Sequence, residues 1–190
     1  MKHLIRIFLC ILLAALAGCA TSPPARFYLL NAPSPQPTAQ HEQEKSKRVS
    51  LQVQIPDYLD RPHIMVREST HRLSLAELDR WAEPLSRMLT RAVTRHLASG
   101  SLPVQVNAPG PVREDLRIWI KILRLDGTPG GKVTLEAKWQ ISPADNASGR
   151  INYFSAAASA PGQDIEGLVQ AHEQVIQDLA SVIAQALQER

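Results

Sequence analysis

The sequence predicts an α+β fold, in which a mostly antiparallel sheet carries two main amphipathic helices on one face; a mixed sheet is the alternative. Two observations lead to this prediction. Short stretches in which apolar and polar residues alternate recur along the chain, as expected of half-buried strands. Two longer stretches repeat apolar residues every three or four positions, as expected of helices that bury one side. A sheet covered on one face by both helices buries all of these apolar surfaces.

The composition fits one ordinary globular core. The chain has 190 residues, of which 44% are hydrophobic and 21% are charged. These fractions exclude a polytopic membrane protein and a wholly disordered chain. A chain of this length is long enough to bury a core of its own. We therefore expect a single α/β domain over residues 26–190.

The first 18 residues resemble a bacterial lipoprotein signal peptide. Lys2 and Arg6 form a basic start, residues 7–17 form an uninterrupted apolar run, and Leu16, Ala17, Gly18 and Cys19 close it. The run is shorter than the roughly 20 residues that a membrane-spanning helix needs. Resemblance to the lipobox implies cleavage after Gly18, and a diacylglycerol and an N-acyl chain on Cys19. The alternative is a cleaved secretory signal that happens to contain a cysteine.

The residues after the cleavage site indicate the compartment and exclude one class of partner. Ala20 stands where an aspartate would resemble an inner-membrane retention signal, so we expect the outer membrane, on its periplasmic face, in a Gram-negative cell. Without Lys2 and Arg6, 19 of the 21 basic residues remain against 18 acidic ones. A chain so nearly neutral offers no broad field for phosphate backbones, so we expect no nucleic-acid partner.

The first half of the mature chain begins with a tether and short strands. Residues 19–25 contain Pro23 and Pro24 and are expected to form an extended lipidated tether. Strands are predicted at residues 26–30 and 49–55, separated by a mobile loop at about 31–48 that lacks apolar periodicity. Residues 64–67 and 71–73 could pair as a short hairpin.

A first helix is predicted after a capping box formed by Ser74 and Glu77. Apolar residues from Leu78 to Leu97 share one face of this helix. Pro84 either kinks it or separates a short helical turn from a second helix. Arg80, Arg87, Arg91 and Arg95 would form a basic stripe along it, which could meet lipid phosphates or an acidic partner. The alternative is an ordinary solvated face.

The second half predicts four strands and a long helix. Strands are expected at residues 104–107, 116–125, 133–141 and 150–158, and the second and third of these read as an antiparallel hairpin. One face of the strand at 133–141 is apolar and the other is polar. Trp119 stands on the polar face of its strand, as an interface anchor or under a covering loop. A helix is predicted over residues 165–187.

Motifs of catalysis and metal binding are absent from the sequence. It contains no nucleophile elbow, no zinc-binding His-Glu-x-x-His, no paired Cys-x-x-Cys and no phosphate-binding loop. His96 and His172 lie on apolar helix faces, where a packed histidine is commoner than a metal ligand. Asp57 and Asp60 are better explained by a turn after Pro56 than by acid–base chemistry. We therefore expect no enzyme activity, no metal and no cofactor besides the covalent lipid.

Several segments together resemble the ABC-type transport auxiliary lipoproteins. They are the lipobox, the start Arg-Phe-Tyr-Leu-Leu at 26–30, Ile-Pro-Asp-Tyr-Leu-Asp-Arg-Pro at 55–62, and Arg-Trp-Ala-Glu-Pro-Leu at 80–85. The resemblance implies an α/β domain and an outer-membrane partner for an MCE-domain protein, which is anchored in the inner membrane and spans the periplasm. It implies the transport of phospholipids or other hydrophobic molecules between the membranes. Self-association into a homo-oligomeric ring is a further implication.

The sequence leaves three functions open. In the first, the protein docks the transport system, and its candidate contact residues are Tyr58, Leu59, Arg61, Arg80 and Trp119. The alternative for these residues is that they shape a turn and pack a helix entrance. In the second, the protein carries lipid and needs an apolar cavity. In the third, it is an envelope-assembly or cell-wall-binding lipoprotein.

Overall fold

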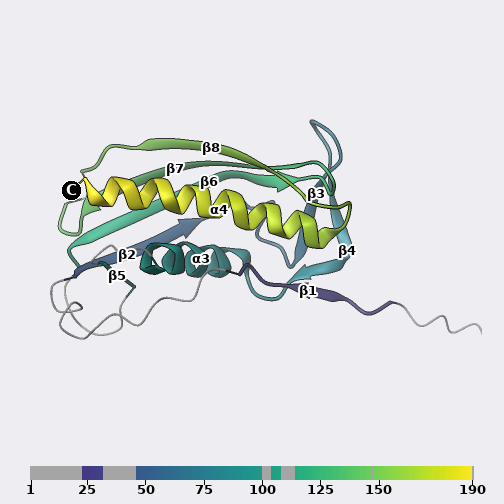
Figure 1. The fold of residues 1–190 in the computed structure, drawn as a ribbon, viewed down its shortest axis with the longest axis horizontal. Coiled ribbons are helices and arrows are strands. Elements are labelled where there is room, and N and C mark those ends of the chain that lie inside the picture. Colours follow the sequence, from purple (N-terminus) through teal and green to yellow (C-terminus); the bar gives the residue numbers. More distant parts are fainter. Residues whose placement is uncertain (1–22, 32–45, 100–103, 108–113, 147, 190) are drawn as a thin grey trace, which may run out of the picture.

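The computed structural model describes residues 23–31, 46–99, 104–107, 114–146 and 148–189, which form one eight-stranded sheet and two helices (Figure 1). Both helices cover the same face of the sheet, which confirms the predicted α+β class. In chain order the elements are β1 (Arg26–Tyr28), β2 (Lys47–Gln54), β3 (His63–Arg67), β4 (Leu73–Trp81), α3 (Leu85–Ser99), β5 (Val104–Val106), β6 (Leu116–Gly127), β7 (Lys132–Pro143), β8 (Asn152–Ser159) and α4 (Ile165–Gln188).

The sheet is organised around β6. One edge of β6 pairs antiparallel with β7 along its whole length, and β7 pairs antiparallel with β8. The other edge is shared, because β2 pairs with the first half of β6 and β3 meets it at Gly127. β5 then extends the sheet beyond β2, while β4 and β1 extend it beyond β3.

The sheet is mixed, and parallel neighbours predominate. Among the described strands, β1 with β4, β2 with β5, β2 with β6 and β3 with β6 are parallel, against three antiparallel pairings. The expectation of a mostly antiparallel sheet is therefore wrong, and the mixed alternative is correct. The hairpin of residues 116–125 with 133–141 is confirmed as β6 and β7. The predicted short hairpin after residue 63 forms as β3 and β4, but its second strand is 73–81 and not 71–73, so only Leu73 of the predicted residues pairs.

The core lies between the sheet and the helices. The alternating residues of β7 predicted to be apolar are all buried, from Val133 to Ile141. They face α4, whose apolar stripe includes Leu168, Val175 and Leu179, each at most 1% exposed. α3 packs against β2, β5 and α4. This confirms the second helix and the one-sided burial of β7.

The segment before Pro84 is a strand, not a helix. Residues 73–81 form β4, and α3 begins at Leu85. The amides of Arg87 and Met88 donate to the carbonyl of Pro84, so this proline starts the helix, where its missing N–H costs nothing. The predicted capping box of Ser74 and Glu77 is therefore wrong. Of the two alternatives for Pro84, a helix that begins near it is correct, but no helical turn precedes it.

Three predictions fall wholly or partly outside the described residues. The signal peptide of residues 1–18 lies outside them, as do Cys19 and residues 20–22 of the predicted tether and residues 32–45 of the predicted mobile loop. The end of that loop is corrected, because β2 already begins at Lys47. The remaining strands match their predictions to within two residues at most boundaries.

We predict that Gly167→Ala strongly destabilises the fold. Asp164 caps α4 by accepting the amide of Gly167 at 2.8 Å, which draws the chain close to the preceding loop. A Cβ atom on Gly167 would lie 1.6 Å from the carbonyl oxygen of Pro161, so the helix start must shift. Thermal unfolding should show that the free energy of unfolding falls by about 2 kcal/mol or more. Gln170→Ala, an exposed change one turn later, should be near neutral; equal stability of both variants would contradict this packing.

Candidate functional site

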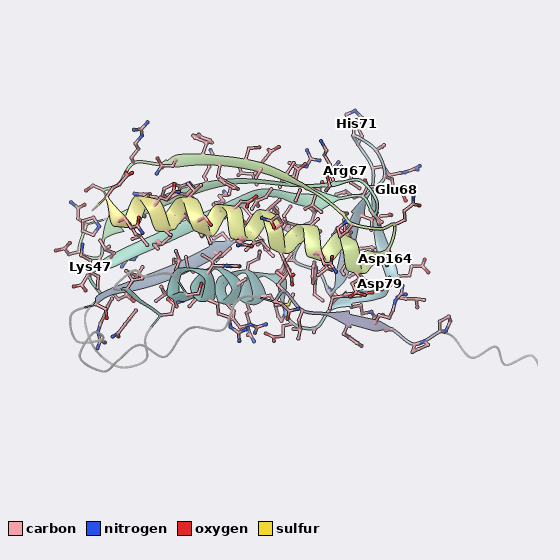
Figure 2. All side chains as sticks on the ribbon, viewed as in Figure 1. Lys47, Arg67, Glu68, His71, Asp79 and Asp164 are labelled. Atoms are coloured by element: carbon pink, nitrogen blue, oxygen red, sulfur yellow. The ribbon has the colours of Figure 1, made fainter. Side chains whose placement is uncertain are left out.

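The chain enters the fold through an ion pair between β1 and β4. The guanidinium of Arg26 donates two hydrogen bonds to Asp79, at 2.7 and 2.9 Å, and the hydroxyl of Tyr28 donates to the same carboxylate at 2.9 Å. Asp79 is only 5% exposed, whereas Arg26 is largely open to solvent. Burial and the neighbouring Asp79 raise the pKa of Tyr28. Asp79 lies at the end of the molecule that holds Asp164 and the start of α4 (Figure 2).

Tyr58 and Leu59 occupy a tight turn between β2 and β3. The amide of Leu59 donates to the carbonyl of Pro56 at 2.9 Å, and that of Asp60 donates to Asp57 at 3.2 Å. The side chain of Leu59 is buried in the core, at 3% exposure. It therefore packs the turn and does not present a contact surface.

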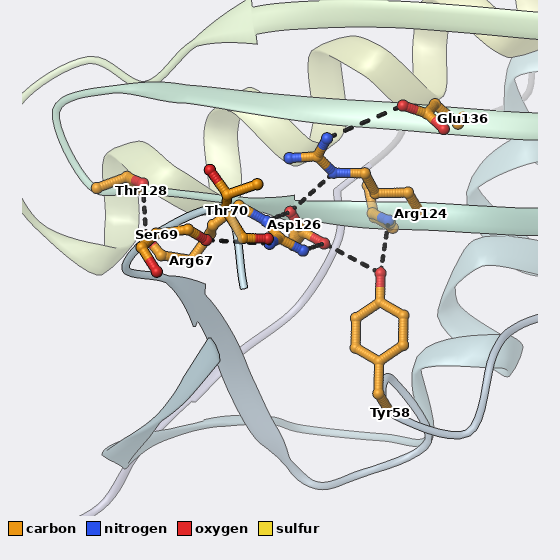
Figure 3. A network of polar contacts seen from close by, with 9 residues as sticks. Tyr58, Arg67, Ser69, Thr70, Arg124, Asp126, Thr128 and Glu136 are labelled. Carbon is orange, nitrogen blue, oxygen red and sulfur yellow. Dashed lines mark hydrogen bonds and ion pairs between the residues drawn. The ribbon is translucent and has the colours of Figure 1, made fainter. Parts of the chain in front are cut away.

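The hydroxyl of Tyr58 completes the hydrogen bonding of β6. It accepts the amide of Leu125 at 3.3 Å and donates to Asp126 at 3.0 Å (Figure 3). Leu125 lies between the stretch of β6 that pairs with β2 and the position that meets β3. The tyrosine thus supplies an acceptor on the edge of β6 opposite β7, at a position where no described strand pairs with that edge. Burial raises the pKa of Tyr58 to about 12, so its hydroxyl stays protonated.

Asp126 is the centre of the largest polar cluster around this turn. Its side chain is completely buried and is bonded by the guanidinium groups of Arg67 and Arg124 as well as by Tyr58. Arg67 binds both carboxylate oxygens and also donates to the carbonyls of Ser69 and Thr70 in the β3–β4 loop (Figure 3). Burial raises the pKa of Asp126, but the hydrogen bonds from the two arginines outweigh it and the pKa is lowered. The cluster therefore holds a buried anion that joins β3, β6 and the Tyr58 turn.

The other three candidate contact residues come from three different segments of the chain. Arg61 is exposed after the turn, and Arg80 is partly buried on β4, opposite His63. The Nε of Arg80 has no hydrogen-bond partner within the part of the chain that the structure describes. Trp119 is partly buried on β6, paired with Gln52 and Gln140 in the half of the sheet that contains β2.

The predicted basic stripe is shorter than expected. Arg80 belongs to β4, so Arg87, Arg91 and Arg95 remain on α3. Arg91 donates to both carboxylate oxygens of Glu83, at 2.9 and 2.7 Å, and this hydrogen bonding lowers the pKa of Glu83.

A shallow groove with a volume of about 630 Å³ runs along the surface between α3 and β2. Arginine and hydroxyl side chains of the helix form one wall, and the last residues of β2 form the other. The lining residues are Leu51, Gln52, Val53, Gln54, Ser86, Arg87, Thr90, Arg91, Thr94, Val106 and Asn107. No sequence pattern pointed to this groove, because its two walls are more than 30 positions apart.

The two helical histidines are packing residues in the structure. His172 is buried, its Nδ1 donates to the carbonyl of Leu168 at 2.7 Å, and its ring meets Trp81 edge to face at 5.8 Å. Burial lowers the pKa of His172 and of the partly buried His96. Within the described ranges, no three His, Cys, Asp or Glu side chains gather closely enough to hold a metal ion. None of the described helices is long and apolar enough to cross a membrane.

We predict that Tyr58→Phe destabilises the fold even though it keeps the ring. The change leaves the amide of Leu125 without its acceptor and removes a donor from Asp126. Chemical denaturation should show that the free energy of unfolding falls by about 1–2 kcal/mol. Tyr153→Phe is the matched control, because Tyr153 is 73% exposed and should tolerate the loss. If Tyr58→Phe is as stable as the wild type, the hydroxyl of Tyr58 does not stabilise the fold and is free for another role.

We predict a pH-dependent loss of stability for Asp126→Asn. The neutral amide of asparagine cannot balance the charges of two arginines. The free energy of unfolding of the variant should therefore fall by about 3 kcal/mol at pH 7. Because the pKa of Asp126 is lowered in the folded state, the carboxylate stabilises the fold above its ordinary pKa and this contribution is lost on acidification. The difference in free energy of unfolding between the wild type and Asp126→Asn should therefore shrink below about pH 4. Denaturation curves with exposed Asp57→Asn as control test this; a deficit independent of pH would contradict it.

Comparisons with known proteins place this fold in one family. The family model of the ABC-type transport auxiliary lipoprotein component matches residues 28–184. A crystal structure of an uncharacterized protein has a TM-score of 0.72 and 18% identity, covering 86% of this chain and 99% of its own. A Xanthomonas campestris protein of the DUF330 family has a TM-score of 0.67 and 20% identity, covering 84% and 93%. No curated protein matches the chain. The family match spans most of the chain, which therefore belongs to the ABC-type transport auxiliary lipoprotein component family.

Proposed function

We propose that this chain is a non-catalytic lipoprotein of the outer membrane that docks an MCE-type system for lipid transport between the two membranes. The observation that carries the proposal is the family match over residues 28–184, together with the lipobox that ends at Cys19. Family membership makes the chain an auxiliary component of a transport system. The MCE-domain partner and the outer membrane are our own additions.

The proposed anchor would keep the domain close to the bilayer. We propose that Cys19 carries a diacylglycerol and an N-acyl chain, since several acyl chains hold a protein far more firmly than one. β1 begins seven residues later, at Arg26. At roughly 3.3 Å per extended residue, this spacing allows a reach of about 23 Å. The ion pair of Arg26 with Asp79 would pass a pull on the tether directly to β4.

Docking fits the packing better than lipid carriage does. A lipid in transit needs shelter, because each methylene exposed to water costs about 0.8 kcal/mol. A carrier would supply an apolar cavity between the sheet and the helices. In this chain, that layer is filled by side chains that are almost fully buried, including Ile118, Leu135 and Leu179. The groove beside α3 is walled by arginines and hydroxyls, which suit a polar partner better than an acyl chain.

The contact residues that remain open to a partner are Arg61, Arg80 and Trp119. We propose that Tyr58 and Leu59 act through the shape of the turn, which presents Arg61.

Self-association into a ring is supported by the edge strand β8. Its outer edge has no described neighbour, and residues 151–160 contain no charged side chain. Natural edge strands usually carry charges or prolines that prevent pairing with another chain. Ile151 and Tyr153 are 50% and 73% exposed at its start. A second copy that met this edge with a different surface of its own would form a head-to-tail contact, which can close into a ring.

We predict that capture of an MCE-domain protein depends on the anchor. In cross-linked envelopes, the wild-type chain should sediment with the outer membrane and capture an MCE-domain protein. Cys19→Ala should lose both, because it has no thiol to acylate. Cys10→Ala is the matched control, since Cys10 lies in the segment that we expect to be removed. Equal capture by Cys19→Ala, or capture of an unrelated envelope complex, would contradict the proposal.

A further inference from the structure

The groove between β2 and α3 borders a strand edge that is only partly paired. β5 pairs with β2 over Lys47 to Val49, and no described strand continues this pairing toward Gln54. At the end of β5, Asn107 adopts a left-handed conformation with φ of 49°. Its amide donates to the carbonyl of Val49 at 2.8 Å, and its side-chain oxygen accepts the amide of Leu51 at 2.9 Å. Asn107 therefore ends the pairing at the mouth of the groove.

The backbone of β2 beyond Asn107 offers further hydrogen bonds. The amide of Leu51 points to the β5 side, and backbone groups of alternate residues in a strand point to the same side. The carbonyl of Leu51 and both backbone groups of Val53 therefore face the groove. Such a row of groups is a template on which an extended peptide adds as a further strand.

The helical wall of the groove selects for negative charge. Arg87 is exposed and forms no ion pair with a described residue, whereas Arg91 is already held by Glu83. Thr94 also lines the groove, and its buried hydroxyl has no hydrogen-bond partner among the described residues. A guanidinium group binds a carboxylate through two parallel hydrogen bonds. A carboxylate on the incoming strand would therefore pair with Arg87, while the hydroxyl of Thr94 lies about two helical turns further along α3.

We propose that the groove between β2 and α3 binds an extended, carboxylate-bearing peptide segment of a partner protein, which adds to β2 as a strand and pairs with Arg87. This proposal rests on the proposed docking function, because it names the place on the chain where docking occurs. Recognition then has two parts. The backbone of β2 fixes the extended conformation of the segment, and Arg87 selects those segments that carry an acidic residue.

Site-specific photo-cross-linking in the cell envelope tests this proposal. A benzoylphenylalanine at Thr90 in the full chain places the reactive group in the groove, and the same group at the exposed Gln170 of α4 is the control position. We expect an adduct from position 90 whose cross-linked peptide, sequenced by mass spectrometry, contains an aspartate or glutamate. This adduct should be absent from position 170.

Charge variants of α3 separate the groove from the rest of the helix. Arg87→Glu should reduce the adduct at least fivefold, and Arg87→Lys should retain part of it. Arg95→Glu is the matched control, because Arg95 lies on α3 but does not line the groove. In this variant the adduct from position 90 should persist. Thermal unfolding of each variant checks that the fold is intact.

Three results would overturn the proposal. They are an adduct within this chain itself, a cross-linked peptide without an acidic residue, and an adduct that Arg87→Glu leaves unchanged. An acidic peptide from an envelope protein without an MCE domain would support the groove while it contradicts the proposed partner. The two claims can therefore fail separately.

Discussion

The fold depends on how one edge of β6 is completed. β2 covers the first half of this edge and β3 meets only its end, so the stretch between them needs another source of hydrogen bonds. The turn after Pro56 supplies it through the hydroxyl of Tyr58, which accepts the amide of Leu125. A buried backbone group without a partner costs as much as a lost hydrogen bond. This side chain therefore fills the gap that β2 and β3 leave along the same edge of β6.

The same place holds a buried charge, which makes its geometry demanding. Taking a carboxylate out of water is costly unless hydrogen bonds surround it. Asp126 receives them from Arg67, Arg124 and Tyr58, which come from different segments of the chain. Arg67 in turn holds the β3–β4 loop. The segment at 55–62, which the family resemblance singled out, thus has a structural role that its sequence does not reveal.

Local patterns predicted those elements whose burial is regular along the chain. The helix at 165–187 and the strand at 133–141 bury one side at a constant period, and both were predicted correctly. β4 was predicted wrongly, because Leu, Ala and Glu in residues 73–81 favour a helix and apolar residues recur at a spacing compatible with one. Pairing with β1 and β3, and the bonds of Asp79 to Arg26 and Tyr28, decide its conformation. The contacts with β1 span 51 to 53 positions, so no local pattern contains them.

The candidate site shows the same division. The exposed position of Arg61 and the packing of the two histidines follow from local sequence. Asp126 lies just beyond the strand predicted at 116–125, although it and Gly127 belong to β6. The groove has no local signal at all, because a parallel sheet assembles its walls from separate segments.

The proposed function joins a membrane anchor to a domain that binds a partner, and it depends first on the anchor. Mass spectrometry of the amino-terminal peptide of the mature protein tests the anchor most directly. We expect a chain that starts at Cys19 and carries both a diacylglycerol and an amide-linked acyl group. A free thiol at this residue, in protein recovered from the soluble periplasm, would contradict it.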